Sequence, residues 1–146
     1  MTEAAPITLA TDIKVPFYDV DSMGIVWHGH YVKYFEDARC QLLDALGYNY
    51  QHMRDSGYGF PVVDIRLKYV KPAKFNRVVR VEAKLQEWEV RLKIDYRIID
   101  IDSGETLTKG YSVQVAVDLQ SGEMCYAAPA ILQEKIAAYR LREAGQ

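Results

Sequence analysis

The 146-residue sequence lacks the features that mark several classes of protein. Its two cysteines, Cys40 and Cys125, are too few for a disulfide framework and have no metal-ligand spacing, so we expect two small buried residues. A net charge of -2 argues against a protein that binds nucleic acid through its overall field. The sequence holds no run of about 18 apolar residues, so we expect no membrane span.

Common catalytic motifs are missing as well. There is no Gly-x-Ser-x-Gly, no phosphate-binding glycine-rich loop and no dinucleotide fingerprint. The first residues show no basic and apolar leader pattern, so we expect no signal peptide and a cytoplasmic location. At 49% hydrophobic and 26% charged residues, the composition is that of a soluble globular protein. The length predicts one domain over residues 1–146.

The N-terminal half predicts one strand and one long helix. We expect a loose tail over residues 1–8, a strand over residues 11–17 and a loop over residues 18–27. A polar stretch over residues 48–59 has room for a helical turn. Residues 28–46 form the helix, because its apolar positions keep 3-4 spacing. These positions are Tyr31, Tyr34, Phe35, Ala38, Leu42 and Leu46.

The rest of the chain alternates with period two, which is typical of strands covered on one face. We expect four consecutive, meandering strands over residues 63–69, 79–85, 92–98 and 111–117, and a last helix over residues 129–142. A helix and a sheet that each have one face to bury should pack on each other. The fold class is therefore α+β, with the sheet wrapped around the long helix.

The segment from Asp19 to Gly24 joins the first strand to the long helix, with two histidines shortly after it. Calcium binding is excluded, because His30 stands where a calcium loop needs its twelfth-position Glu. His28-x-His30 has no third ligand nearby, so we expect no metal. Asp21 and His28 remain as candidate catalytic residues. The alternative is that Asp19 or Asp21 only caps the helix and His28 is a first-turn polar residue.

Residues 17–39 resemble the signature of the 4-hydroxybenzoyl-CoA thioesterase family of hotdog-fold acyl-CoA thioesterases. The matching positions are Phe17, Asp19, Asp21, Gly24, Val26, His28, Tyr31, Phe35, Glu36, Ala38 and Arg39. The resemblance implies a hotdog fold and hydrolysis of an acyl-CoA, with coenzyme A as part of the substrate and no separate cofactor. One sheet and one long helix leave edge strands, so we expect a homodimer with a continuous sheet that doubles to a homotetramer. The resemblance implies active sites at the dimer interface.

By that resemblance Asp21 occupies the catalytic aspartate position, as nucleophile or as the base that directs water. His28 stands where members with aromatic substrates carry a Tyr and where aliphatic members often carry a His, which favours a broader or aliphatic acyl group. Two alternatives remain open. One is a hotdog dehydratase acting on 3-hydroxyacyl thioesters, and the other is a non-catalytic acyl-thioester binding module.

A local reversal of charge gives a second, independent signal. Between Ile65 and Val81 the chain carries six basic residues and no acidic one. We expect Lys71, Lys74 and Arg77, which flank Pro72, to bind the phosphates of coenzyme A. The alternatives are a solvated strand face and, less favoured because aromatic residues are few, single-stranded nucleic acid.

Overall fold

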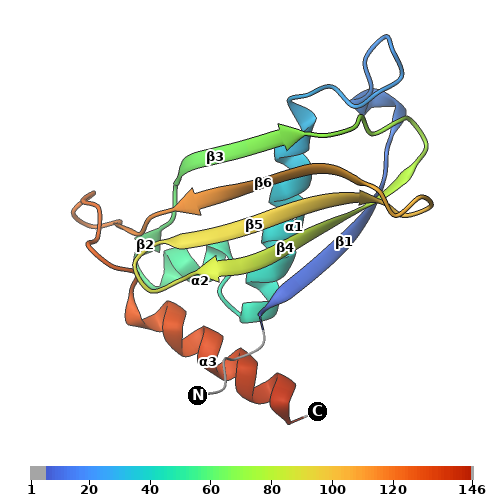
Figure 1. The fold of residues 1–146 in the computed structure, drawn as a ribbon. Coiled ribbons are helices and arrows are strands. Elements are labelled where there is room, and N and C mark those ends of the chain that lie inside the picture. Colours follow the sequence, from blue (N-terminus) through green and yellow to red (C-terminus); the bar gives the residue numbers. More distant parts are fainter. Residues whose placement is uncertain (1–5, 146) are drawn as a thin grey trace.

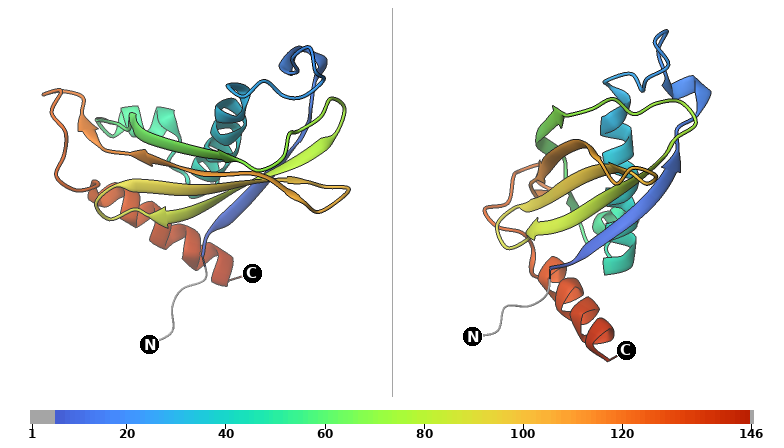
Figure 2. Two further views of the ribbon diagram at one scale, coloured as in Figure 1. Left: turned by 45° about the horizontal axis from the view of Figure 1, so that its top comes forward. Right: turned by 45° about the vertical axis from the view of Figure 1, so that its right-hand side comes forward.

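In the computed structural model, which describes residues 6–145, a curved antiparallel sheet packs over one long helix (Figure 1). Two further views show the long helix on one side of the sheet and the last helix across the end of the layer (Figure 2). The elements are β1 (Thr8–Lys14), the 3-10 turn η1 (Phe17–Asp19), α1 (His30–Leu46), α2 (Tyr50–Asp55), β2 (Tyr58–Gly59), β3 (Val62–Tyr69), β4 (Val78–Glu87), β5 (Leu92–Asp100), β6 (Thr106–Gln114), β7 (Val117–Asp118) and α3 (Ala130–Ala144).

The five main strands have the order β1-β4-β5-β6-β3, and every neighbouring pair is antiparallel. The expected four-strand meander is correct for β4, β5 and β6 but wrong for β3, which pairs with β6 instead of β4. The connection over residues 70–77 crosses the end of the sheet, where Ala73 accepts a backbone hydrogen bond from Val26 (2.8 Å). Strand β3 therefore forms one edge of the sheet.

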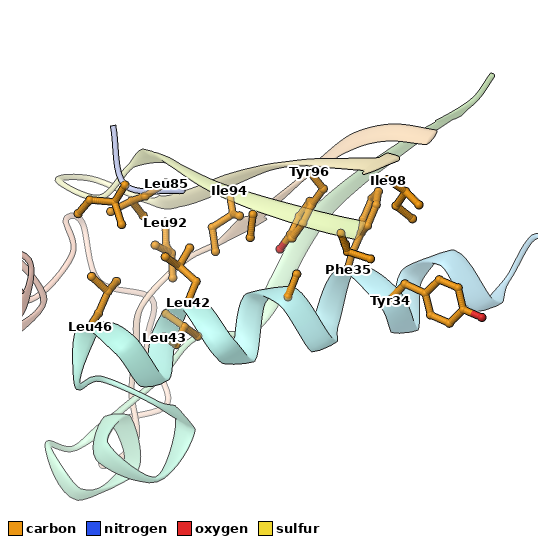
Figure 3. Close-up of a cluster of buried hydrophobic side chains, with 14 of the residues drawn as sticks. Tyr34, Phe35, Leu42, Leu43, Leu46, Leu85, Leu92, Ile94, Tyr96 and Ile98 are labelled. Atoms are coloured by element: carbon orange, nitrogen blue, oxygen red, sulfur yellow. The ribbon is translucent and has the colours of Figure 1, made fainter. Parts of the chain in front are cut away.

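The core lies between α1 and the sheet, as the helical spacing predicted. All six apolar positions predicted to face inward from α1 are buried. Phe35 stacks on Tyr96 of β5, with ring centroids 4.3 Å apart (Figure 3). Fully burying a side chain such as Leu42 contributes roughly 2 kcal/mol, so this stripe is a main source of stability.

Strand β6 turns toward α1 the opposite face from the one that its apolar residues predicted. Thr108, Gly110 and Ser112 lie opposite the buried face of β5, so Tyr111 and Val113 lie on the other face, where Val113 is nevertheless buried. Gly110 explains the choice, because a Cβ there would lie 2.8 Å from the Phe35 ring and 2.1 Å from a backbone oxygen of β3. Beyond Gln114 the expected strand ends, and residues 117–118 pair with β2.

The element ends differ from the sequence expectation by a few residues. Strand β1 begins at Thr8 and ends before Pro16, because proline has no N–H for the ladder. Of the tail expected over residues 1–8, residues 1–5 lie outside the described residues, whereas Ile7 is buried. Helix α3 agrees closely with the predicted C-terminal helix, with Leu132 and Ile136 on its buried face.

Candidate active site

The candidate active site is built on a tight loop, called here the site loop (residues 20–26), which stands before α1. Val20 and Val26 form an isolated antiparallel bridge, and the Asp21 N–H donates to the Ile25 carbonyl (2.8 Å). Gly24 turns the chain with φ of 74°, a conformation that side chains with a Cβ rarely adopt. Asp21 is exposed, and its Oδ1 accepts a hydrogen bond from the Met23 N–H (2.9 Å). The carboxylate is thus held within its own loop and still open to a substrate.

Helix α1 begins two residues later than expected, at His30, with Gly29 as its N-cap residue. Among residues 6–145 no side chain caps it, and its first turn holds no acidic residue, so the interpretation of Asp19 or Asp21 as the cap is wrong. N–H groups at a helix start favour a negatively charged ligand atom, although here the His30 N–H already donates to the Trp27 carbonyl (2.9 Å). The Trp27 indole lies over Gly29 so closely that a Cβ there would be 2.0 Å from the ring.

His28 lines an apolar hollow of about 340 Å³ between the helix start and the end of β3. The Tyr69 hydroxyl donates to the His28 carbonyl (2.8 Å), and the Tyr31 hydroxyl accepts from the Ala73 N–H (3.0 Å). Burial raises the pKa of Tyr31, and the negative charge of Asp21 adds to the rise. Asp21 therefore lies within electrostatic reach of this hollow, although no hydrogen bond joins it to His28 within residues 6–145.

A second, more polar hollow of about 430 Å³ abuts the first, because Lys71 and Pro72 line both. It brings together all three predicted phosphate contacts, but two of them already have acidic partners. Lys71 pairs with Glu105. Arg77 pairs with Asp100, and the hydrogen bonds that the Asp100 carboxylate accepts, first of all from Arg77, hold the pKa of Asp100 below its usual value. Lys74 has no side-chain partner in the described part of the chain.

The structure adds residues that the sequence pattern did not single out. Asp19 is buried beneath the site loop, where it accepts hydrogen bonds from Lys33 and Tyr34. Tyr69 contacts the His28 backbone from a strand 41 positions away. No spacing in the sequence indicates these partners, because they meet only when β3 and η1 pack against α1.

Other chemistry has little support at this site. Over residues 6–145, no three His, Cys, Asp or Glu side chains gather as a metal ion would require. Cys40 is partly buried, and burial raises its pKa, which favours the unreactive thiol.

No helix in the described residues is long and apolar enough to cross a membrane.

Comparison with known proteins decides the family. The model of the family described as "Thioesterase-like superfamily" matches residues 15–138. The chain belongs to this superfamily. YneP of Bacillus subtilis, named as a candidate acyl-CoA thioesterase, is 32% identical over 111 residues, which are 75% of this chain and 80% of that protein. The long-chain acyl-CoA thioesterase FadM of Escherichia coli is 26% identical over 88% of this chain and 96% of its own.

A solved structure supports the fold of this thioesterase-like chain. The DHNA-CoA thioesterase from Staphylococcus aureus superimposes with a TM-score of 0.79 over 95% of each chain, at 24% identity. The hotdog fold expected from the sequence is therefore confirmed, and family membership supports a thioester hydrolase.

Proposed function

We propose that the protein hydrolyses acyl-CoA thioesters at the junction of the site loop and α1. The observation that carries the proposal is the exposed Asp21 carboxylate in the loop before α1, whose charge reaches Tyr31 in the wall of the apolar hollow at the helix start. A thioester carbonyl over the helix start would receive backbone hydrogen bonds as its oxygen becomes negative. One well-aimed donor is worth about 3 kcal/mol of transition-state stabilisation.

Asp21 has two possible roles in this reaction. As a nucleophile, a carboxylate oxygen bonds to the acyl carbon, the C–S bond breaks, and coenzyme A leaves as a thiolate that takes up a proton. Water then hydrolyses the resulting mixed anhydride. As a general base, Asp21 takes a proton from water, whose oxygen attacks the acyl carbon directly. In both cases the products are the free acid and coenzyme A, and His28 orients the carbonyl or the water.

Measuring thiol release from a panel of acyl-CoAs tests this function. We expect release from several acyl-CoAs and its loss in Asp21→Asn. The 4-hydroxybenzoyl group fits less well than an aliphatic or broader acyl group, because His28 stands where the resemblance places Tyr in enzymes with aromatic substrates. Dehydration of 3-hydroxyacyl thioesters without thiol release would favour the dehydratase, and tight binding without turnover would favour the binding module.

The two adjoining hollows suggest a path for coenzyme A. The arm that carries the thiol would follow the apolar hollow from His28 past Tyr69 and Pro72, and the phosphates would reach the polar hollow at Lys71, Lys74 and Arg77. Lys74 is the strongest of the three candidates, because the acidic partners of the other two offset their charge. Neither a cofactor nor nucleic acid has a place in this proposal, and the cytoplasmic location stays a prediction.

The edge of β3 is the surface that best fits a second copy of this chain. Val63 is 57% exposed there and Tyr69 50%, and an exposed apolar edge strand invites pairing. On the outer face of β3, Asp64, Arg66 and Lys68 follow one another at every second residue. Antiparallel pairing about a two-fold axis at Ile65 would place Asp64 opposite Arg66 of the partner subunit, twice over.

Neighbouring registers are less favourable for the charges. An axis at Arg66 would place two arginines face to face, and an axis at Leu67 would place Arg66 opposite Lys68 of the partner subunit. The register about Ile65 would also bring the partner's Pro61 opposite Tyr69, at the wall of the apolar hollow. We therefore propose a homodimer with a continuous sheet in which each copy completes the other's site. A homotetramer stays a prediction.

A further inference from the structure

Asp19 is a buried carboxylate to which the proposed reaction gives no role. It is 2% exposed and lies at the end of η1, beneath the site loop. Its Oδ1 accepts a hydrogen bond from Lys33 Nζ and its Oδ2 accepts one from the Tyr34 hydroxyl, both at 2.7 Å. His30 Nε2 lies 3.9 Å away. All three neighbours belong to the first turns of α1, so one carboxylate binds the helix start.

The backbone of Asp19 holds the site loop at the same time. Its carbonyl accepts a hydrogen bond from the Trp27 N–H (3.0 Å), which closes the loop at its far end. The next residue, Val20, bridges to Val26, and Asp21 follows directly. The side chain of Asp19 is thus fixed to α1, and its main chain is fixed to both ends of the segment that carries Asp21.

Electrostatic interactions hold the Asp19 side chain on its two partners in α1. Burial alone would raise the pKa of Asp19, but the hydrogen bonds from Lys33 and Tyr34 outweigh it and leave the pKa below its usual value. Burial and the adjacent Asp19 raise the pKa of Tyr34, whose hydroxyl points away from the leucine cluster toward the helix start (Figure 3). Only the carboxylate of this pair is buried, since the Lys33 side chain is 46% exposed and that of Asp19 2%. Removing a partner from a buried carboxylate is costly, so both oxygens of Asp19 stay on their partners in α1.

We infer that Asp19 is a positioning residue that sets where Asp21 lies relative to the start of α1. This inference rests on the proposed function, because it requires Asp21 to act on the thioester. Asp21 and the helix N–H groups must meet the same carbonyl from two directions, and a misplacement of about 1 Å can cost 100-fold in rate. Asp19 itself is buried and does not touch the substrate.

Two matched tyrosine variants separate positioning from a general loss of packing. Tyr34→Phe and Tyr48→Phe each remove one buried hydroxyl with a 2.7 Å hydrogen bond, to Asp19 and to Ser56 respectively. We expect similar falls in melting temperature. Only Tyr34→Phe should lower kcat, by about 10-fold or more with KM nearly unchanged. Equal kcat values in the two folded variants would overturn the inference.

A double-mutant cycle tests whether Asp19 acts through Asp21. If it does, Asp19→Asn lowers kcat in the wild-type background. In the Asp21→Asn background, measured at high enzyme concentration, the same change leaves the residual rate almost unaltered. Independent, multiplying effects would contradict the inference. Should Asp19→Asn fail to fold, Tyr34→Phe replaces it in the same cycle. If Asp21→Asn itself keeps full activity, the proposed catalytic assignment fails. If Asp21→Asn is inactive while the Asp19 and Tyr34 variants are normal, only the positioning role fails.

Discussion

The Tyr69 hydroxyl donates a 2.8 Å hydrogen bond to the backbone carbonyl of His28. This bond joins the last residue of the edge strand β3 to the residue that stands two positions before α1. The candidate dimer edge and the candidate catalytic histidine are therefore mechanically linked. A second copy that pairs with β3 would also fix Tyr69, and through it one wall of the apolar hollow.

Asp21→Asn should keep the fold and lower kcat by about 100-fold or more, because a catalytic carboxylate would be lost. Asp118→Asn is a matched control, since Asp118 also accepts a hydrogen bond from the N–H two residues on (2.8 Å), but in the β7 turn. Thiol release and circular dichroism measure activity and folding. Near-normal turnover of folded Asp21→Asn would remove Asp21 from the mechanism.

His28→Ala should cost less activity than Asp21→Asn, because the backbone donors at the helix start remain in place. Both variants are compared by kcat on the same acyl-CoA. The hydrogen bond from Tyr69 reaches the main chain of residue 28 and does not depend on the imidazole. A larger loss from His28→Ala than from Asp21→Asn would favour the dehydratase mechanism.

Charge reversal on β3 tests the proposed dimer. Arg66→Asp should weaken the dimer, because each copy would face Asp64 of the partner subunit with a like charge. Adding Asp64→Arg should restore the pairing with the signs exchanged. Lys84→Asp, which changes an exposed charge on the interior strand β4, is the control. Light scattering follows the mass, and a stable, active monomer of the unchanged protein would contradict the proposal.

Replacing Lys71, Lys74 and Arg77 together by Gln should raise KM for acyl-CoA and leave kcat nearly unchanged, as expected for binding lost away from the chemistry. Lys74→Gln should have the largest single effect, because its charge has no partner in residues 6–145. Salt should diminish the difference, since the Debye length is about 10 Å at 0.1 M. A short acyl thioester without the nucleotide is the control. An unchanged KM at low salt would assign these residues to a solvated face.

Acid should destabilise the protein partly through Asp19. Its pKa is lowered in the folded protein, so its contribution to stability is present above the unfolded value of about 3.9 and is lost as pH falls through the lower folded value. Urea unfolding between pH 6 and pH 3 should therefore show a steeper loss in the wild type than in folded Asp19→Asn. Parallel curves for the two proteins would show that Asp19 makes no such contribution.

The sequence by itself determined the features that depend on near neighbours in the chain. The 3-4 spacing of Tyr31, Phe35 and Leu42 identified the buried face of α1, because helical geometry repeats that spacing whatever the helix packs against. The nearness of Asp21 and His28 to a helix start followed in the same way from their positions.

Only the tertiary structure decided which distant segments meet. Period two cannot say which face of β6 is buried, and it was Gly110, by admitting the Phe35 ring, that turned Tyr111 outward. Nor can local pattern place β3 beside β6. The ion pair of Lys71 with Glu105 joins residues 34 positions apart, and burial of Asp19 requires η1 to pack on α1. Such partners are set by the packing of whole elements, which a local repeat does not encode.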